Sequence, residues 1–116
     1  MKKGLLVLLS SLLLSTASIA SENTAKGLNV IITSEDAQTQ MMGMVLSMMT
    51  LKQSKEVNMT LCSKAGDLAV KGMESPILKP QDKSPKMMLQ ALMKQGAKVT
   101  VCPLYLPNAS KDESVL

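Results

Sequence analysis

The residues best suited to chemistry in this 116-residue chain are two cysteines, Cys62 and Cys102. The chain contains no histidine, which excludes Ser-His and Cys-His catalysis and every histidine-ligated metal site. All 13 basic residues are lysines, so the bidentate guanidinium clamp that often holds phosphate or carboxylate is also absent. We therefore expect any chemistry of this protein to be sulfur chemistry.

Each cysteine ends a predicted strand. Apolar and β-branched residues predict strands at 57–62 and 98–102, and Pro103 prevents the second strand from simply continuing. Open α/β sheets place their ligand sites at the carboxyl ends of strands, which makes Cys102 the leading candidate and Cys62 a possible partner thiol. The alternative is a buried, inert Cys102, which is a common state for cysteine. The residue types do not decide between the two.

Methionines suggest a second kind of site. Five of the eleven crowd one predicted helix, at residues 35–52. Three share a helical face and two lie beside it: Met41, Met44 and Met48, with Met42 and Met49. Thioethers and thiolates suit Cu(I), so a copper site is one interpretation. The simpler interpretation is that these methionines fill an irregular core and support adaptable subunit contacts.

The N-terminus has the features of a signal peptide. Lys2 and Lys3 precede an apolar run at residues 5–14, and Ser18 and Ala20 fit the small-residue pattern of a cleavage site. An uncleaved anchor is the alternative, but the run is shorter than the roughly 20 apolar residues of a membrane span. We expect cleavage after Ala20 and a periplasmic or secreted protein, with no stable membrane insertion.

The mature chain is only mildly basic. Removal of residues 1–20 takes away two of the 13 lysines and none of the nine acids, which leaves a net charge of about +2. The lysines are scattered, and Tyr105 is the single aromatic residue, so the chain has no platform on which bases could stack. A nucleic-acid partner is not expected.

Strands and helices alternate along the rest of the chain. Strands are expected at 28–33, 57–62 and 98–102, and helices at 35–52, 65–71 and 84–96. Alternation of this kind predicts a parallel sheet with right-handed crossovers, and we expect a three-layer α/β/α sandwich. The helix at 35–52 has little polar surface, which predicts cover by the sheet and by a second subunit in a homo-oligomer.

The end of the chain predicts one more helix. Ser110 and Glu113 form a capping box, the signature of a helix start, yet only three residues follow. A helix of one turn is not stable alone. We therefore expect the last elements of the domain to be missing. The predicted organisation is a signal peptide at 1–20, a short polar tail at 21–27 and an incomplete domain at 28–116.

An even number of cysteines in an exported protein also raises the question of a disulfide. If the strand order is 2-1-3, two gaps of about 4.8 Å separate the strands that end in Cys62 and Cys102. That separation exceeds the roughly 7 Å limit between bridged Cα atoms. A disulfide would then require one cysteine to move into its loop, and the sequence leaves the pairing open.

Three segments resemble the DsrE/DsrF-like family of small sulfur-relay proteins. They are the strand at 28–33 with its helix-start loop, the turn at 61–66, and residues 96–103, in which a Gly-x-x-Val-x-Val strand ends in Cys102. The resemblance implies that Cys102 carries sulfur as a persulfide, received from a donor protein and passed to an acceptor, with no cofactor. Such a protein is a carrier rather than a turnover enzyme. Some relatives have a second cysteine where this chain has Tyr105.

Overall fold

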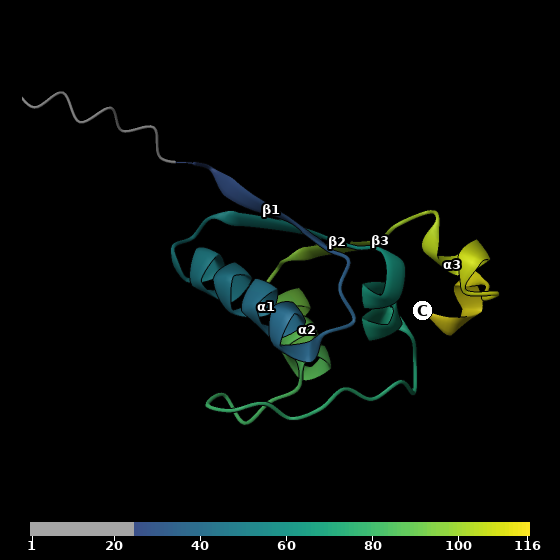
Figure 1. Cartoon of the computed structure of the whole chain (residues 1–116). Helices are drawn as coiled ribbons and strands as arrows, with labels where there is room; N and C mark the ends of the chain where they lie inside the picture. The colour runs from purple at the N-terminus through teal and green to yellow at the C-terminus, as the bar shows by residue number, and fades with distance from the viewer. Residues whose placement is uncertain (1–24) are drawn as a thin grey trace, which may run out of the picture.

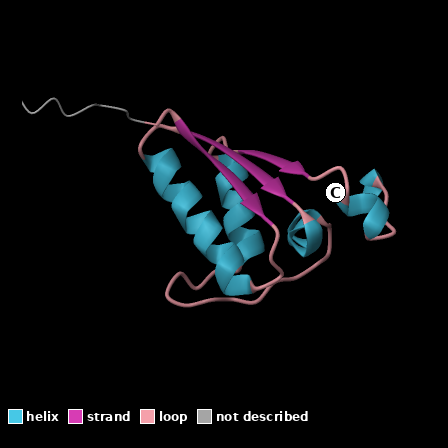
Figure 2. Ribbon diagram, turned by 45° about the horizontal axis from the view of Figure 1, so that its top comes forward, coloured by secondary structure: helices cyan, strands magenta, loops and turns pink. Residues whose placement is uncertain are grey.

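A parallel sheet of three strands is the centre of the fold in the computed structural model, which describes residues 25–116. The strands are β1 (Gly27–Ile32), β2 (Glu56–Leu61) and β3 (Lys98–Val101). They lie in the order β1-β2-β3 and all run in the same direction (Figure 2). The predicted α/β fold with a parallel sheet is therefore confirmed.

Two helices cover one face of this sheet. They are α1 (Ala37–Lys52) and α2 (Pro85–Lys94), which lie side by side beneath the strands (Figure 1). Each helix lies in the connection between two neighbouring parallel strands. When successive connections have the same hand and the strands follow one another across the sheet, the helices lie on the same face. The predicted third layer is therefore wrong for residues 25–116, which form a sheet layer and a helix layer.

The two faces of the sheet differ in polarity. Val57, Met59 and Leu61 point toward the helices and are almost completely buried. The opposite face carries Thr60 and Thr100, whose hydroxyl oxygens lie 3.2 Å apart across β2 and β3. In β1 only Ile32 is fully buried. On the sheet face that carries Thr60 and Thr100, polar residues at every second position of β2 and β3 allow contact with water.

The helix starts follow local capping rules. Ser84 accepts a hydrogen bond from the Met87 N–H at 3.1 Å, and Pro85 occupies the first turn of α2, as predicted. The start of α1 is capped by the Asp36 carboxylate, which accepts from the Thr39 N–H at 2.8 Å. These hydrogen bonds lower the pKa of Asp36, because they stabilise its ionised form.

The C-terminal segment differs from the sequence prediction. The short helix α3 (Tyr105–Asn108) lies before Ser110, and Ser110 itself has a φ of 54°, which no helix start adopts. The predicted capping box is therefore wrong. A single 3-10 turn, η2 (Glu113–Val115), closes the segment instead and is capped by Asp112.

A second 3-10 helix links the C-terminal segment to the sheet. This helix, η1 (Ser63–Ala69), begins directly after β2. Lys71, just beyond η1, donates from its N–H to the Val115 carbonyl at 2.8 Å. The C-terminus thus lies beside η1, beyond the carboxyl ends of the strands (Figure 1).

Within residues 25–116 no helix has the length and apolar character needed to cross a membrane. The predicted signal peptide at residues 1–20, and residues 21–24 of the polar tail, lie outside the described part of the chain.

Candidate functional site

Cys62 and Cys102 are neighbours at the carboxyl edge of the sheet. The register pairs Leu61 with Val101, and the ladder continues one residue further, because the Cys102 N–H donates to the Leu61 carbonyl at 2.9 Å. The Cys62 N–H likewise donates to the Ile32 carbonyl of β1 at 2.8 Å. Both cysteines are free thiols and half-buried. By the alternation of the strands they lie on the polar face of the sheet.

The strand order of 2-1-3 considered above is wrong, because β2 is the central strand. Cys62 and Cys102 therefore lie on adjacent strands, which are spaced by about 4.8 Å in a sheet. Cα atoms of disulfide-bonded cysteines are usually about 4.4–6.8 Å apart. The geometric objection to a Cys62–Cys102 bridge no longer holds, and a disulfide between them requires no large movement of either loop.

The two thiols have unequal acidity. The interaction with the Cys62 thiol, followed by the backbone N–H of Leu104, lowers the pKa of Cys102 below its usual value. The same interaction with Cys102, together with burial, raises the pKa of Cys62. Of the two, Cys102 is the thiol that ionises first, and the thiolate is the nucleophilic form.

An open hollow with a volume of about 670 Å³ lies in front of both thiols. Its walls come from η1, α3 and the segment after α3. Lys64 and Lys111 line it together with Asp67, so two cationic side chains and one anionic side chain face the space in front of the cysteines. The hollow can therefore admit a small, anionic sulfur compound or the end of a partner's side chain.

Tyr105 fixes one wall of the hollow. Its side chain is only 4% exposed, and its hydroxyl donates a hydrogen bond to the Asp67 carboxylate. Burial and the neighbouring Asp67 raise the pKa of Tyr105 to about 12. The ring lies against Gly66, where an added Cβ atom would come within 2.4 Å of it. Sequence reasoning did not foresee this role, and its one signal was a lone aromatic residue close to Cys102.

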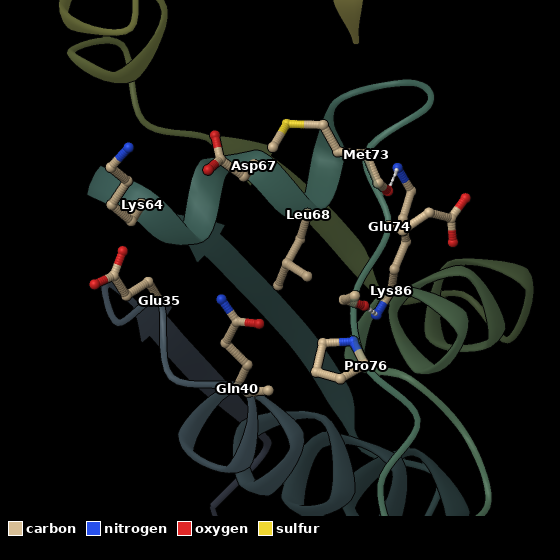
Figure 3. Close-up of a pocket in the computed structure, with 11 residues that line it drawn as sticks. Glu35, Gln40, Lys64, Asp67, Leu68, Met73, Glu74, Pro76 and Lys86 are labelled. Carbon is tan, nitrogen blue, oxygen red and sulfur yellow. Dashed lines mark hydrogen bonds between the residues drawn. The ribbon is translucent and has the colours of Figure 1, made fainter.

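A smaller hollow of about 140 Å³ lies on another side of η1, between the start of α1 and the loop before α2 (Figure 3). The Lys86 ammonium group donates to the Val70 carbonyl and, at 2.8 Å, to the Met73 carbonyl. The Gln40 amide donates to the Ser34 carbonyl at 2.8 Å. These polar groups hold loops in place, and this hollow contains neither cysteine.

The methionines proposed as copper ligands lie in or against the core. Met41 and Met44 are buried, and Met48 is partly buried against the same cluster. Their thioethers occupy positions that apolar side chains fill in other cores. Among residues 25–116 no three His, Cys, Asp or Glu side chains come together as a metal site. Copper binding at Met41, Met44 and Met48 stays a prediction without a supporting contact.

No family model, no curated protein and no solved structure matches this chain. The fold and the site define a small α/β domain with a three-stranded parallel sheet and helices packed against it. Two adjacent cysteines lie at the carboxyl edge of that sheet.

Proposed function

We propose that this protein is an exported sulfur carrier of the DsrE-like kind, in which Cys102 accepts sulfane sulfur as a persulfide. The observation that supports the proposal most is the pairing of Cys102 with Cys62 on adjacent strands. This pairing and the Leu104 N–H lower the pKa of Cys102, which favours its nucleophilic thiolate form at a half-exposed position. A buried, inert cysteine would gain no such stabilisation of its anion.

The transfer reaction needs no cofactor. The Cys102 thiolate attacks the outer sulfur of a donor persulfide, R–S–SH. A new S–S bond forms on Cys102, the donor's S–S bond breaks, and its electron pair leaves on the donor thiolate. The proton stays on the transferred sulfur, and no net oxidation occurs. Delivery is the same exchange in reverse, with an acceptor thiolate attacking the outer sulfur of Cys102–S–SH.

The surroundings of Cys102 suit this exchange. Persulfides and inorganic polysulfides are anionic, and the Lys64 and Lys111 side chains line the hollow in front of the thiols. The hollow is open, so a donor or acceptor thiol can reach Cys102 along the same path. A carrier needs such access for two different partners, whereas a structural cysteine needs none.

The sequence supports the location and the family. The motif at residues 96–103 resembles the DsrE/DsrF-like strand that ends in a cysteine, and the N-terminal pattern at 1–20 favours a periplasmic or secreted protein. Three strands and one helix layer are fewer than that family's three-layer sandwich, so we propose the kinship for the site and its strand. The alternative is a soft-metal or structural protein whose thiols carry no sulfur.

Single-thiol variants test the proposal. After reduction, treatment with inorganic polysulfide and desalting, we expect Cys62→Ser to carry one persulfide per chain in a persulfide-selective alkylation assay. Cys102→Ser is expected to carry about tenfold less, because Cys62 has no equivalent of the Leu104 N–H that stabilises a thiolate. Circular dichroism of both variants checks that the fold is kept. Equal labelling of the two variants, or no labelling of Cys62→Ser, would contradict the carrier function.

A further inference from the structure

We infer that Cys62 discharges the sulfur held on Cys102 as sulfide and closes a Cys62–Cys102 disulfide. The inference rests on the proposed carrier function and assigns Cys62 a role in it. Its basis is the register, which pairs Leu61 with Val101 and so brings the next residues, Cys62 and Cys102, side by side just beyond β2 and β3. A persulfide on Cys102 therefore has its inner sulfur beside the Cys62 thiol.

The discharge step balances without an oxidant. The Cys62 thiolate attacks the inner sulfur of Cys102–S–SH, the Cys62–Cys102 bond forms, and the outer S–S bond breaks. Its electron pair leaves with the outer sulfur as HS⁻. The two cysteine sulfurs lose two electrons when the disulfide forms, and these electrons reduce the sulfane sulfur to sulfide. An external dithiol then restores both thiols by exchange.

The spacing of the strands permits this bond. Adjacent strands are about 4.8 Å apart, and disulfide-bonded Cα atoms are usually about 4.4–6.8 Å apart. Cys62 follows Leu61 with extended backbone, so it still lies at strand spacing from Cys102 when η1 begins. Both residues lie just beyond the last residues of β2 and β3, and a carbonyl group of a neighbouring strand accepts from the N–H of each, which keeps the two cysteines side by side.

The acidity of Cys62 sets the rate of this step. Burial favours its neutral form, and a thiol whose pKa is not lowered is mostly protonated at neutral pH, so a persulfide on Cys102 persists long enough to be passed on. The charged and titratable groups that line the hollow with it are Cys102, Lys64, Asp67, Lys111 and Tyr105, whose pKa is raised to about 12. Discharge is thus expected to be slow at acidic pH, where Cys62 is protonated, and to accelerate when the pH is raised, because the attacking form of Cys62 is the thiolate.

The test loads the exported protein with inorganic polysulfide at mildly acidic pH, desalts it and raises the pH. We expect the wild type to release one sulfide per chain and to end two hydrogens lighter than its reduced form. Cys62→Ser should keep one added sulfur atom and release sulfide at least tenfold more slowly. Ser63→Ala, which changes the adjacent residue and keeps both thiols, should behave as the wild type.

The outcomes separate the two proposals. If Cys62→Ser holds sulfur but releases sulfide as fast as the wild type, the discharge step is overturned and the carrier function stands. Discharge is also overturned if the loaded wild type never forms the disulfide. If Cys62→Ser holds no sulfur at all, the carrier function fails first, and the discharge step fails with it.

A second and independent inference concerns the outer surface of α1. The geometry points to a dimer in which this helix packs antiparallel against α1 of a second copy. Met42, Leu46 and Met49 form an outer stripe at spacings of four and three residues, and they are 59%, 48% and 54% exposed. The sheet covers the opposite side of α1, so this stripe is the apolar part of the helix that stays exposed.

The charges around α1 favour a second copy as the occupant. No charged residue lies between positions 37 and 51, whereas Glu35 and Asp36 precede the helix and Lys52 and Lys55 mark its end. An antiparallel pair related by a two-fold axis near Leu46 brings the acidic start of each helix near the basic end of the other. It also opposes the two helix dipoles, and methionine packs well at such adaptable contacts.

Sedimentation velocity of exported wild type and two variants tests the dimer. We expect the wild type to sediment as a dimer and Leu46→Glu as a monomer, because a charge in the centre of the stripe cannot be desolvated. Ile31→Glu is the matched control, since Ile31 is 70% exposed but lies on the sheet face away from the helices. A monomeric wild type, a dimeric Leu46→Glu or a monomeric Ile31→Glu would each overturn the α1 dimer.

Discussion

Replacement of Leu92 by alanine is expected to lower the free energy of unfolding by about 2–5 kcal/mol, the range observed when a buried leucine is truncated. Leu92 is fully buried in α2, where it belongs to the same apolar cluster as Met44 of α1 and Leu61 of β2. A sheet covered on one face has only this cluster for a core. The loss should therefore approach the upper part of the range, and urea denaturation followed by far-ultraviolet circular dichroism measures it.

Met93 provides the matched control for this prediction. It is the next residue of the same helix, but its side chain is 53% exposed. Met93→Ala should therefore change the free energy of unfolding by no more than about 0.5 kcal/mol. Comparable losses for Leu92→Ala and Met93→Ala would mean that α2 does not present Leu92 to the sheet, and the packing described here would be incorrect.

Gly66→Ala is expected to destabilise the protein by about 1–3 kcal/mol and to disturb the wall of the hollow. The new Cβ atom would lie 2.4 Å from the ring of Tyr105, which is buried and bound to Asp67 and so has little freedom to move. Tyr105 is the only aromatic residue of the chain, so its intrinsic fluorescence reports directly on this site. We expect altered tyrosine emission in the folded variant together with the loss of stability.

A double-mutant cycle isolates the contact between Gly66 and Tyr105. In a Tyr105→Ala background the ring is absent, and the added methyl group of Gly66→Ala has room. Its cost should then fall to about 0.5 kcal/mol or less. An equal cost of Gly66→Ala in both backgrounds would show that backbone strain in η1, rather than the tyrosine ring, makes glycine necessary there.

Local signals in the sequence predicted the elements well, but they did not predict how many layers the elements form. Ser84 and Pro85 indicate the start of α2 because capping depends on a few neighbouring atoms. The three-layer sandwich was assumed from the alternation of strands and helices alone. Thr60 and Thr100 already gave the contrary signal, since polar residues at alternate positions are typical of a sheet with one open face.

The candidate site could be predicted only in part, because its geometry depends on contacts between residues that are far apart in the sequence. The carboxyl-edge positions of Cys62 and Cys102 follow from the strand pattern, whereas their adjacency follows from β2 being the central strand. Strand order is a property of the tertiary fold, and no residue motif in the chain encodes it. The contact of Tyr105 with Gly66 is similar, because it joins residues 39 positions apart through the fold of η1 and α3.

The most direct test of the sulfur-carrier proposal is to locate the added sulfur atom by fragmentation mass spectrometry. The wild type and Cys62→Ser are reduced, and each is loaded separately with inorganic polysulfide at mildly acidic pH. Both proteins are then alkylated and digested without reductant. The proposed function predicts one additional sulfur atom on the peptide that contains Cys102, in both proteins, and none on the wild-type peptide that contains Cys62. Sulfur found on Cys62 alone, or on neither cysteine, would contradict the proposal that Cys102 is the acceptor.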